Sequence, residues 1–167
     1  MVAELEEQHI RFNFETIHIE DIIKEVMVGI SPLAQQRSIA IRYQTSESPS
    51  PVNADREQLH RVFEYILENA ITYSPSNSNI EITVLHQPTH AEIIFKDSGI
   101  GIPKDEIPHV FEKFFRGRNA LSNYPVGSGL GLYITKKIIE AHRGRITVES
   151  EEQKGTAFTI ELPLESV

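Results

Sequence analysis

The sequence predicts a single domain of the α/β class, and three observations lead to this prediction. The chain has 167 residues, of which 40% are hydrophobic, which is enough for one domain with a substantial core. In some segments apolar residues recur at every second position, as in strands, and in others every three or four positions, as in helices. The two kinds of segment are interspersed along the chain, so strands and helices are expected to build one fold.

The first third of the chain is predicted to contain two short strands and a helix. Residues 1–10 are polar and acidic and are expected to be a linker or the end of a preceding helix. Alternating apolar residues predict strands over 11–16 and 39–43, and the helix period predicts a helix over 19–33 between them. The Ser- and Pro-rich segment 45–51 is expected to be a loop.

A second helix is predicted to begin at a capping box. Asp55 and Gln58 have the spacing at which the Asp side chain accepts a hydrogen bond from the N–H group three residues on. The apolar stripe of this helix consists of Leu59, Val62, Phe63, Ile66, Leu67 and Ala70. Tyr65, Asn69 and Tyr73 step by four along the edge of the stripe, so they are expected to border the core.

Two polar side chains are predicted to point inward at the ends of strands. Residues 80–84 and 91–97 alternate and flank a turn, which predicts a hairpin. Counting by twos places Asp97 on the apolar face of the second strand, where an ionised carboxylate is costly unless it is hydrogen-bonded. Two further strands are predicted near the C-terminus, and Thr156 opens the last one with its hydroxyl directed inward.

A glycine-rich turn before the last helix indicates a phosphate site. Residues 103–115 are predicted to form a short helix, and the polar segment 120–126 a mobile flap. Gly127, Gly129 and Gly131 then alternate directly before a segment with the helix period. Glycines allow φ values closed to other residues, and the N–H groups at a helix N-terminus carry about half a positive charge. This turn is therefore expected to bind an anion such as phosphate.

Composition argues against several classes of function. The net charge is −8, which is unfavourable for a general nucleic-acid-binding surface. The chain has no cysteine, so disulfides, thiol catalysis and cysteine-bound zinc are excluded. No apolar run reaches the roughly 18–20 residues of a membrane helix. The domain is therefore expected to be cytoplasmic and without direct membrane contact. The parent protein to which it belongs could itself be anchored in a membrane.

Five stretches of the chain occur in an order that points to one family. They cover residues 67–73, 97–103, 111–116, 127–132 and 155–156. Together they resemble the N box, first glycine box, F box, second glycine box and a fifth motif of sensor histidine kinases, members of the GHKL (Bergerat-fold) superfamily that includes gyrase, MutL and Hsp90 ATPases. The resemblance implies an α+β two-layer sandwich, in which a mixed β-sheet packs on three main helices, and an ATP-binding catalytic domain over 11–167.

The resemblance also implies roles for individual residues. Asn69 is expected to hold Mg²⁺ through its amide oxygen, Asp97 to accept a hydrogen bond from the adenine amino group, and Tyr73 to lie against the adenine. Arg116 is expected to act on the transferred phosphoryl group, so Asn69 and Arg116 are the expected catalytic residues. The other expected nucleotide contacts are Gly99, Gly101, Gly127, Gly129, Leu130, Gly131 and Thr156.

Two positions depart from the family pattern and leave alternatives open. Tyr65 stands where the family often has Asn, and Thr72 where it has a basic residue, so a non-catalytic nucleotide-binding or partner-docking module is one alternative. The related ATPases keep a Glu at the position of Tyr65 to activate water, which makes an ATP-hydrolysing clamp a poor fit. A serine kinase of the anti-sigma-factor type is another alternative, against which the F box at 111–116 argues.

The expected phosphoacceptor lies outside this chain. In the family, the acceptor histidine sits in a segment like His-Glu-Leu-Arg-Thr-Pro, and none of the seven histidines here has that context. The resemblance therefore implies transfer of the ATP γ-phosphoryl group to a histidine on the dimerisation and phosphoacceptor domain of the same kinase. A response regulator is the partner expected to be reached through that domain.

Overall fold

The structure is a computed structural model that describes residues 11–46, 51–123 and 127–165. The predicted linker at 1–10 and the last residues of the predicted flap, 124–126, lie outside the described residues. In chain order the elements are β1 (Phe14–Ile17), α2 (Ile19–Gln36), β2 (Ala40–Thr45), β3 (Val52–Asp55), α3 (Arg56–Tyr73), β4 (Asn79–His86), β5 (His90–Lys96), the 3-10 turn η1 (Ile107–His109), α4 (Arg118–Asn123), α5 (Gly131–Ala141), β6 (Arg145–Glu151) and β7 (Gly155–Pro163). Among these helices, none is long and apolar enough to cross a lipid bilayer.

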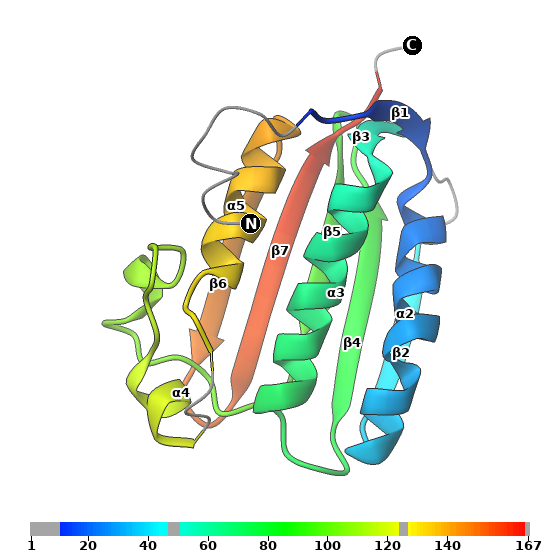
Figure 1. Ribbon diagram of the computed structural model, residues 1–167. Helices are drawn as coiled ribbons and strands as arrows, with labels where there is room; N and C mark the ends of the chain where they lie inside the picture. The colour runs from blue at the N-terminus through cyan, green and yellow to red at the C-terminus, as the bar shows by residue number, and fades with distance from the viewer. Residues whose placement is uncertain (1–10, 47–50, 124–126, 166–167) are drawn as a thin grey trace.

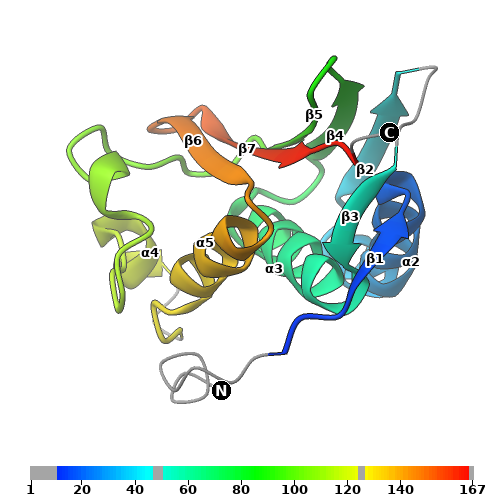
Figure 2. The ribbon, with the colours of Figure 1, turned by 90° about the horizontal axis from the view of Figure 1, so that it is seen from above.

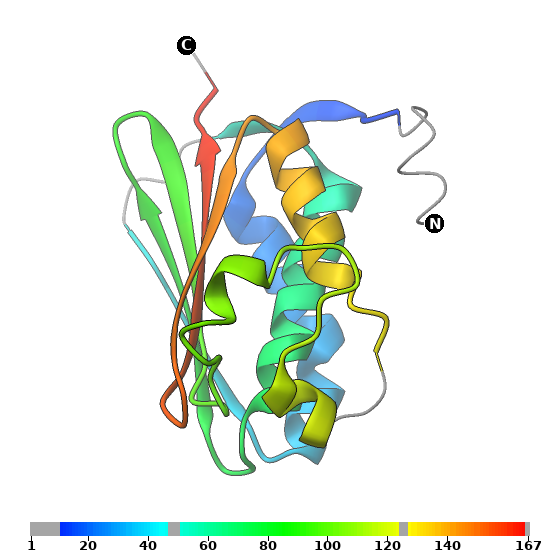
Figure 3. The same ribbon diagram turned by 90° about the vertical axis from the view of Figure 1, so that its left-hand side faces the viewer.

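The elements form two layers. The larger sheet has the strand order β2-β4-β5-β7-β6, in which β2 and β4 are parallel and all other neighbours are antiparallel. Figure 1 shows α2, α3 and α5 in front of this sheet, and the side view in Figure 3 shows them all on one face. This arrangement confirms the predicted fold class, a mixed sheet packed on three main helices.

The strand register puts apolar side chains on the face of the sheet that the helices cover. Ile82 on β4 is opposite Phe95 on β5, and Phe95 is opposite Phe158 on β7. Phe158 is in turn opposite Val148 on β6, and this row of side chains belongs to the core. Glu81, one position before Ile82, is exposed, because successive strand residues point to opposite faces.

Helix α3 is the middle helix and contacts both α2 and α5. The Asp55 carboxylate accepts a hydrogen bond from the N–H of Gln58 at 3.0 Å, so the predicted N-cap is confirmed. The buried face of α3 consists of Leu59, Val62, Phe63, Ile66, Leu67, Ala70 and Ile71. Tyr65, Asn69 and Tyr73 are half-buried, which agrees with their predicted place at the border of the core.

A second sheet of two strands differs from the prediction. β1 begins at Phe14 rather than at residue 11, and no strand was predicted where β3 lies. The two strands are antiparallel, from Phe14 opposite Asp55 to Ile17 opposite Val52; Figure 2 shows them side by side, and Figure 1 shows them at the end of the molecule where α2 and α3 begin. β3 has only four residues, too few for a periodic signal, and it becomes a strand through its pairing with the distant β1.

The segment predicted to be a helix over 103–115 is not one. It contains only the 3-10 turn η1 between other turns. Pro108 has no N–H to donate, and Phe114 has a φ of 64°, which lies outside the helical region. The polar segment that follows is less irregular than predicted, because it starts with helix α4, and Figure 3 shows the chain between η1 and α4 passing in front of α5.

Candidate functional site

A cleft of about 1160 Å³ lies between α3, α5 and the segment that joins β5 to α5. Its lining comes from the edge of α3, from residues within 97–103, 106–120 and 127–138, and from Thr156 and Phe158 on β7. Small-molecule sites usually have volumes of about 300–1,000 Å³. The cleft is therefore large enough for a ligand with several ring and phosphate groups.

Asp97 follows β5 directly and lines the cleft although it is only 8% exposed. Its Oδ1 accepts hydrogen bonds from the N–H groups of Gly99 at 2.7 Å and Thr156 at 3.2 Å. Burial raises the pKa of the Asp97 carboxyl more than these two backbone bonds lower it. Since both bonds end on Oδ1, Oδ2 is the oxygen available to a ligand that donates a hydrogen bond.

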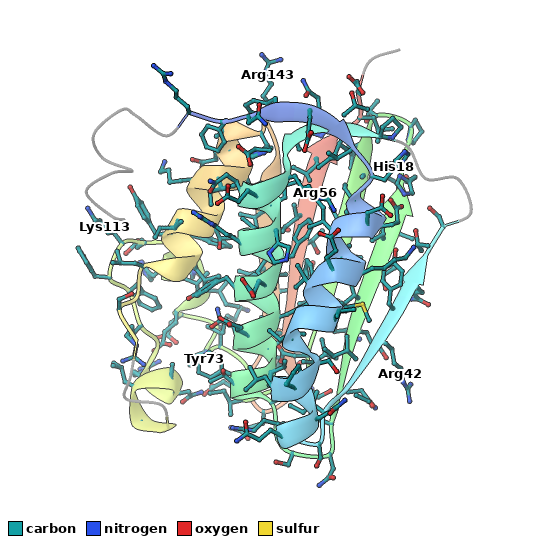
Figure 4. All side chains as sticks on the ribbon, turned by 45° about the vertical axis from the view of Figure 1, so that its right-hand side comes forward. His18, Arg42, Arg56, Tyr73, Lys113 and Arg143 are labelled. Atoms are coloured by element: carbon teal, nitrogen blue, oxygen red, sulfur yellow. The ribbon has the colours of Figure 1, made fainter. Side chains whose placement is uncertain are left out.

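The turn after Asp97 is shaped by close backbone contacts. The Ile100 N–H donates to the carbonyl of Tyr73 at 3.1 Å, and a Cβ on Gly99 would lie 2.7 Å from the same oxygen. Gly101 has a φ of 67°, and a Cβ there would collide with the backbone of the turn after β6. Figure 4 shows Tyr73 at the end of α3, next to α4. The two glycines therefore let this turn pack tightly between α3 and β6.

Thr156 is held by Ser150, a residue that sequence reasoning did not single out. The Ser150 hydroxyl donates to the carbonyl of Gly155 at 2.9 Å and accepts a hydrogen bond from the Ile102 N–H at 2.8 Å. Its oxygen is also 2.8 Å from the Thr156 hydroxyl, which must donate because the single Ser150 proton is already used. Neighbouring strand β6 therefore sets the orientation of Thr156 beside the cleft.

Asn69 and Tyr65 are one helical turn apart on α3, and both line the cleft. Burial raises the pKa of the Tyr65 hydroxyl, and a hydrogen bond with the Asn69 side chain lowers it by less. Among the described residues, no group of three His, Cys, Asp or Glu side chains is placed to hold a metal. An amide oxygen is a hard ligand that suits Mg²⁺, so Asn69 is the candidate metal ligand, with the other positions left to water and phosphate.

The turn before α5 needs glycine at two positions. Gly129 has a φ of 69°, and a Cβ on it would lie 2.7 Å from the backbone of Phe114. Gly127 has a φ of 155°, and a Cβ there would lie 3.4 Å from the guanidinium of Arg116. Both conformations are rare for residues with a side chain. The turn therefore folds against the segment 114–116 and lies next to the Arg116 side chain.

The first turn of α5 faces the cleft without a side-chain cap. Leu130 precedes the helix and makes no capping hydrogen bond through its side chain, so the first N–H groups remain for an anion. Gly131 does not have the positive φ expected from the sequence. Its role is in packing, because a Cβ at this position would collide with the end of the Tyr65 side chain, which would have to move.

Glu106 fastens the start of α4 and was also missed in the sequence. It is buried, and its Oε1 accepts hydrogen bonds from Arg118 Nε at 2.7 Å and from the Arg118 N–H at 3.2 Å. Arg118 also donates to Asp105 at 2.9 Å, and the Asn119 amide donates to Glu152 at 3.2 Å. The helix that borders the cleft is thus tied both to the preceding turn and to the turn between β6 and β7.

Ten of the eleven site residues predicted from the sequence line this cleft, and Gly99 is the exception. Gly99 acts on the site through its hydrogen bond to Asp97. Glu106 and Ser150 were missed because each acts through contacts with residues in other elements. No periodicity or motif in the sequence marks either of them.

A family profile described as histidine kinase-, DNA gyrase B- and HSP90-like ATPase matches residues 54–166. Over 167 residues the chain is 32% identical to the sensor histidine kinase RppB of Synechocystis, in a match that covers 100% of this chain and 37% of RppB. The chain thus spans well under half the length of that curated relative.

Two solved structures are similar to this one over nearly the whole chain. The catalytic domain of histidine kinase ThkA, in a nucleotide-free form, matches with a TM-score of 0.81 and 29% identity over 92% of this chain and 99% of that one. A complex of ThkA with the response regulator protein TrrA matches with a TM-score of 0.80 and 28% identity, over 98% of this chain and 46% of the ThkA chain.

Proposed function

The chain belongs to the family of histidine kinase-, DNA gyrase B- and HSP90-like ATPases, and we propose that its cleft binds Mg²⁺ with ATP for transfer of the γ-phosphoryl group to a histidine of a separate domain. Its relatives and structural neighbours are sensor histidine kinases, so it is a histidine kinase catalytic domain. The observation that carries the proposal is that Asp97, Asn69 and the uncapped start of α5 line one cleft.

Adenine recognition is assigned to Asp97. A buried carboxylate with a free oxygen accepts a hydrogen bond from an exocyclic amino group, whereas a carbonyl oxygen at the same place would be repelled. Tyr73 offers an aromatic ring and Thr156 a fixed hydroxyl in the same cleft, which Gly101 also lines. These features support selectivity for adenine over guanine nucleotides.

The phosphates are assigned to the start of α5 and to Asn69. The free N–H groups at the helix N-terminus and the turn of Gly127 and Gly129 favour phosphate oxygens, and Leu130 and Gly131 begin the helix. The Asn69 amide oxygen would hold Mg²⁺, which when bound neutralises charge on the phosphates. In phosphoryl transfer the protein mainly positions groups and stabilises charge, and the Arg116 guanidinium suits that task.

The described residues that line the cleft include no histidine, and Tyr65 stands where the related ATPases keep a catalytic Glu. Self-labelling needs an imidazole held in line with the γ-phosphate, and fast hydrolysis needs a base for water. The imidazole would have to come from elsewhere. Glu64 also lines the cleft, but it is one position from Tyr65, which turns a helix side chain by about 100°. This supports a division of labour in which the domain binds ATP and a dimerisation and phosphoacceptor domain of the same kinase supplies the nucleophile.

The remaining features of the whole protein belong to the same proposal. We place the catalytic domain at residues 11–167, with 1–10 as a linker or the end of a preceding helix. A response regulator would receive the phosphoryl group from the phosphoacceptor domain, on the cytoplasmic side of the membrane if the parent protein is anchored there. Nucleic acid has no part in this scheme, because the net charge of the chain is −8.

Calorimetric titration with ATP, in Mg²⁺ and then in excess EDTA, tests nucleotide binding. We expect binding that Mg²⁺ strengthens, and weaker binding of GTP. Absence of heat at millimolar ATP would refute the proposal.

Incubation with labelled ATP tests the transfer. The chain alone should take up no label and release little phosphate, and acid-labile label should appear on an added phosphoacceptor domain. Binding without transfer would instead identify a non-catalytic nucleotide-binding module. Acid-stable label on a serine of a partner would identify a serine kinase.

A further inference from the structure

Ser150 on β6 has a full set of hydrogen-bond partners, although it is not among the residues that line the cleft. Its oxygen accepts a hydrogen bond from the Ile102 N–H at 2.8 Å, and its proton goes to the carbonyl of Gly155 at 2.9 Å. The oxygen of the Thr156 hydroxyl lies 2.8 Å from it. A serine hydroxyl has one proton and two lone pairs, so these three contacts use it completely when Thr156 is the donor.

The two backbone partners of Ser150 fix the direction of these hydrogen bonds. A peptide N–H can only donate, and a carbonyl can only accept. If Ser150 turned its proton to Thr156, two oxygens would face each other at 2.9 Å, those of Ser150 and Gly155, with no proton between them. Such an arrangement is costly for groups that are partly or fully buried. The Thr156 proton is therefore directed to Ser150, and the Thr156 oxygen has only lone pairs for a molecule in the cleft.

A second acceptor lies beside Thr156. The Thr156 N–H donates to Asp97 Oδ1 at 3.2 Å, and the Asp97 N–H donates to the Thr156 carbonyl at 2.9 Å, so the two residues hold each other in place. Both line the cleft, and each is 8% exposed. The remaining oxygen of the ionised Asp97 carboxylate, Oδ2, also accepts only. This end of the cleft therefore presents two neighbouring acceptors.

We propose that Ser150 is a positioning residue that sets specificity: it keeps the Thr156 hydroxyl an acceptor, so that the cleft favours a purine with a 6-amino group over one with a 6-carbonyl group. This inference rests on the proposed function for the presence of a purine nucleotide. An amino group brings two N–H donors, whereas a carbonyl is itself an acceptor and would face the oxygens of both Asp97 and Thr156. Ser150 acts on this choice only through Thr156.

The test compares ATP with inosine triphosphate, which has a carbonyl in place of the 6-amino group and a proton on the neighbouring ring nitrogen. Calorimetry measures both affinities for wild type, Ser150→Ala and Ser150→Thr, of which the last keeps a hydroxyl. Ser78→Ala is the matched control. The Ser78 hydroxyl also donates to a backbone carbonyl, that of Pro75 at 2.7 Å, and Ser78 is not among the residues that line the cleft.

In Ser150→Ala we expect the preference for ATP over inosine triphosphate to fall about three- to tenfold, which corresponds to one hydrogen bond. The Thr156 hydroxyl can then turn and donate to the carbonyl of inosine. Ser150→Thr and Ser78→Ala should keep the wild-type ratio of affinities. A general loosening of the site would weaken both nucleotides by the same factor, so an unchanged or increased ratio in Ser150→Ala would overturn the inference.

Thr156→Val tests the same route from its other end. It removes the second acceptor, so the preference for ATP should fall in this variant too, and a rise would overturn the inference. Adding Ser150→Ala to Thr156→Val should leave the ratio where it is. A further change in the double variant would mean that Ser150 acts by another route than Thr156, which would also overturn the inference.

A measurement without nucleotide separates this inference from the proposed function. The hydroxyl proton of Thr156, followed by NMR, should exchange slowly with water in wild type and faster in Ser150→Ala. Equal exchange rates would overturn the role of Ser150. Wild type that binds neither nucleotide would refute the proposed function, while the exchange rates would still decide whether Ser150 holds the Thr156 proton.

Discussion

The two ends of α3 each hold a buried aspartate, and the two carboxylates differ in their hydrogen bonds. Asp55, before the helix, is 5% exposed, and Asp97, beside its C-terminal end, is 8% exposed. Both Asp55 oxygens are used, since Oδ1 accepts from Gln58 N–H at 3.0 Å and Oδ2 from Asn13 N–H at 2.7 Å. In Asp97 both bonds from the backbone reach Oδ1.

The surroundings of the two aspartates also differ, because Asp55 is enclosed by protein groups and Asp97 borders the cleft. The backbone N–H of Asp55 donates to Nε2 of His142 at 2.9 Å, and the rings of Phe12 and Phe14 contact that imidazole. Asp97 lines the cleft instead. Burial alone therefore does not distinguish Asp55, whose two oxygens the protein uses, from Asp97, to which we assign a binding role. The oxygen left over after the protein's own hydrogen bonds does.

Asp97→Asn should give the largest change, in nucleotide binding and not in folding. It replaces the acceptor that we assign to the adenine amino group with a donor, and a hydrogen bond to a charged group corresponds to about 1.5–3 kcal/mol, or ten- to a hundredfold in affinity. Calorimetry with ATP measures this loss. GTP and ATP affinities equal to those of wild type would show that Asp97 has no adenine role.

The same variant should fold at least as stably as wild type at neutral pH. Burial raises the pKa of Asp97, so the native state favours the neutral form and loses stability as pH rises through that pKa. Asn removes the buried charge and keeps an oxygen for Gly99 and Thr156. Urea denaturation at pH 7 checks this expectation, and a marked fall in stability would place Asp97 with Asp55 as a structural residue.

Asp55→Ala should show the reverse pattern. It removes the cap of α3 and the acceptor of the Asn13 N–H, and we expect a loss of about 2 kcal/mol of unfolding free energy with ATP affinity changed less than about twofold. Urea denaturation and calorimetry measure the two quantities. Asp55→Asn is the control, since it retains a capping oxygen and should lose less.

A smaller effect is expected from the pH dependence of His142. Burial lowers the pKa of His142, while its bond to the Ile138 carbonyl and the charge of Asp55 raise it by less. As the pH is lowered, the unfolded chain therefore binds a proton at a higher pH than the native state does. The contribution of His142 to the free energy of unfolding is fully present above pH 6.5 and decreases as the pH drops below it.

Urea denaturation between pH 5 and 8 measures this slope against His142→Gln, which keeps an acceptor for the Asp55 N–H and does not titrate. The variant should be less stable at pH 8 but should have a shallower slope below pH 6.5. Parallel curves would mean that His142 does not titrate differently in the two states.

Glu57→Gln should have the smallest effect, although it lies in the same helical turn as the cap. Its ion pair with Arg61 is a short one, at 2.6 Å, but both side chains are largely exposed. Exposed pairs of this spacing contribute about 0.3–0.5 kcal/mol. Denaturation in low and high salt measures it, and a loss close to that of Asp55→Ala would show that charge, rather than the cap, secures this end of α3.

Short-range patterns in the sequence were sufficient for several helices and strands and for the orientation of some residues of the site. The helix period of α3, the cap at Asp55 and the inward phase of Asp97 each depend on residues within a few positions of one another. Backbone geometry turns such spacing directly into a face of a helix or strand, so the inward place of Asp97 and the border position of Asn69 were predictable, whereas the two-layer fold and the expected role of each site residue came from the resemblance to the kinase family.

Tertiary structure decided the features that depend on distant partners. β3 exists through its pairing with β1, His142 meets Asp55 across 87 positions, and Ser150 and Glu106 act through other elements. The sequence suggested a conformational reason for Gly131, whereas the structure shows a packing reason, the ring of Tyr65. Such contacts form only after strands and helices have packed. The spacing of residues near each partner in the sequence does not show which distant residue it will contact.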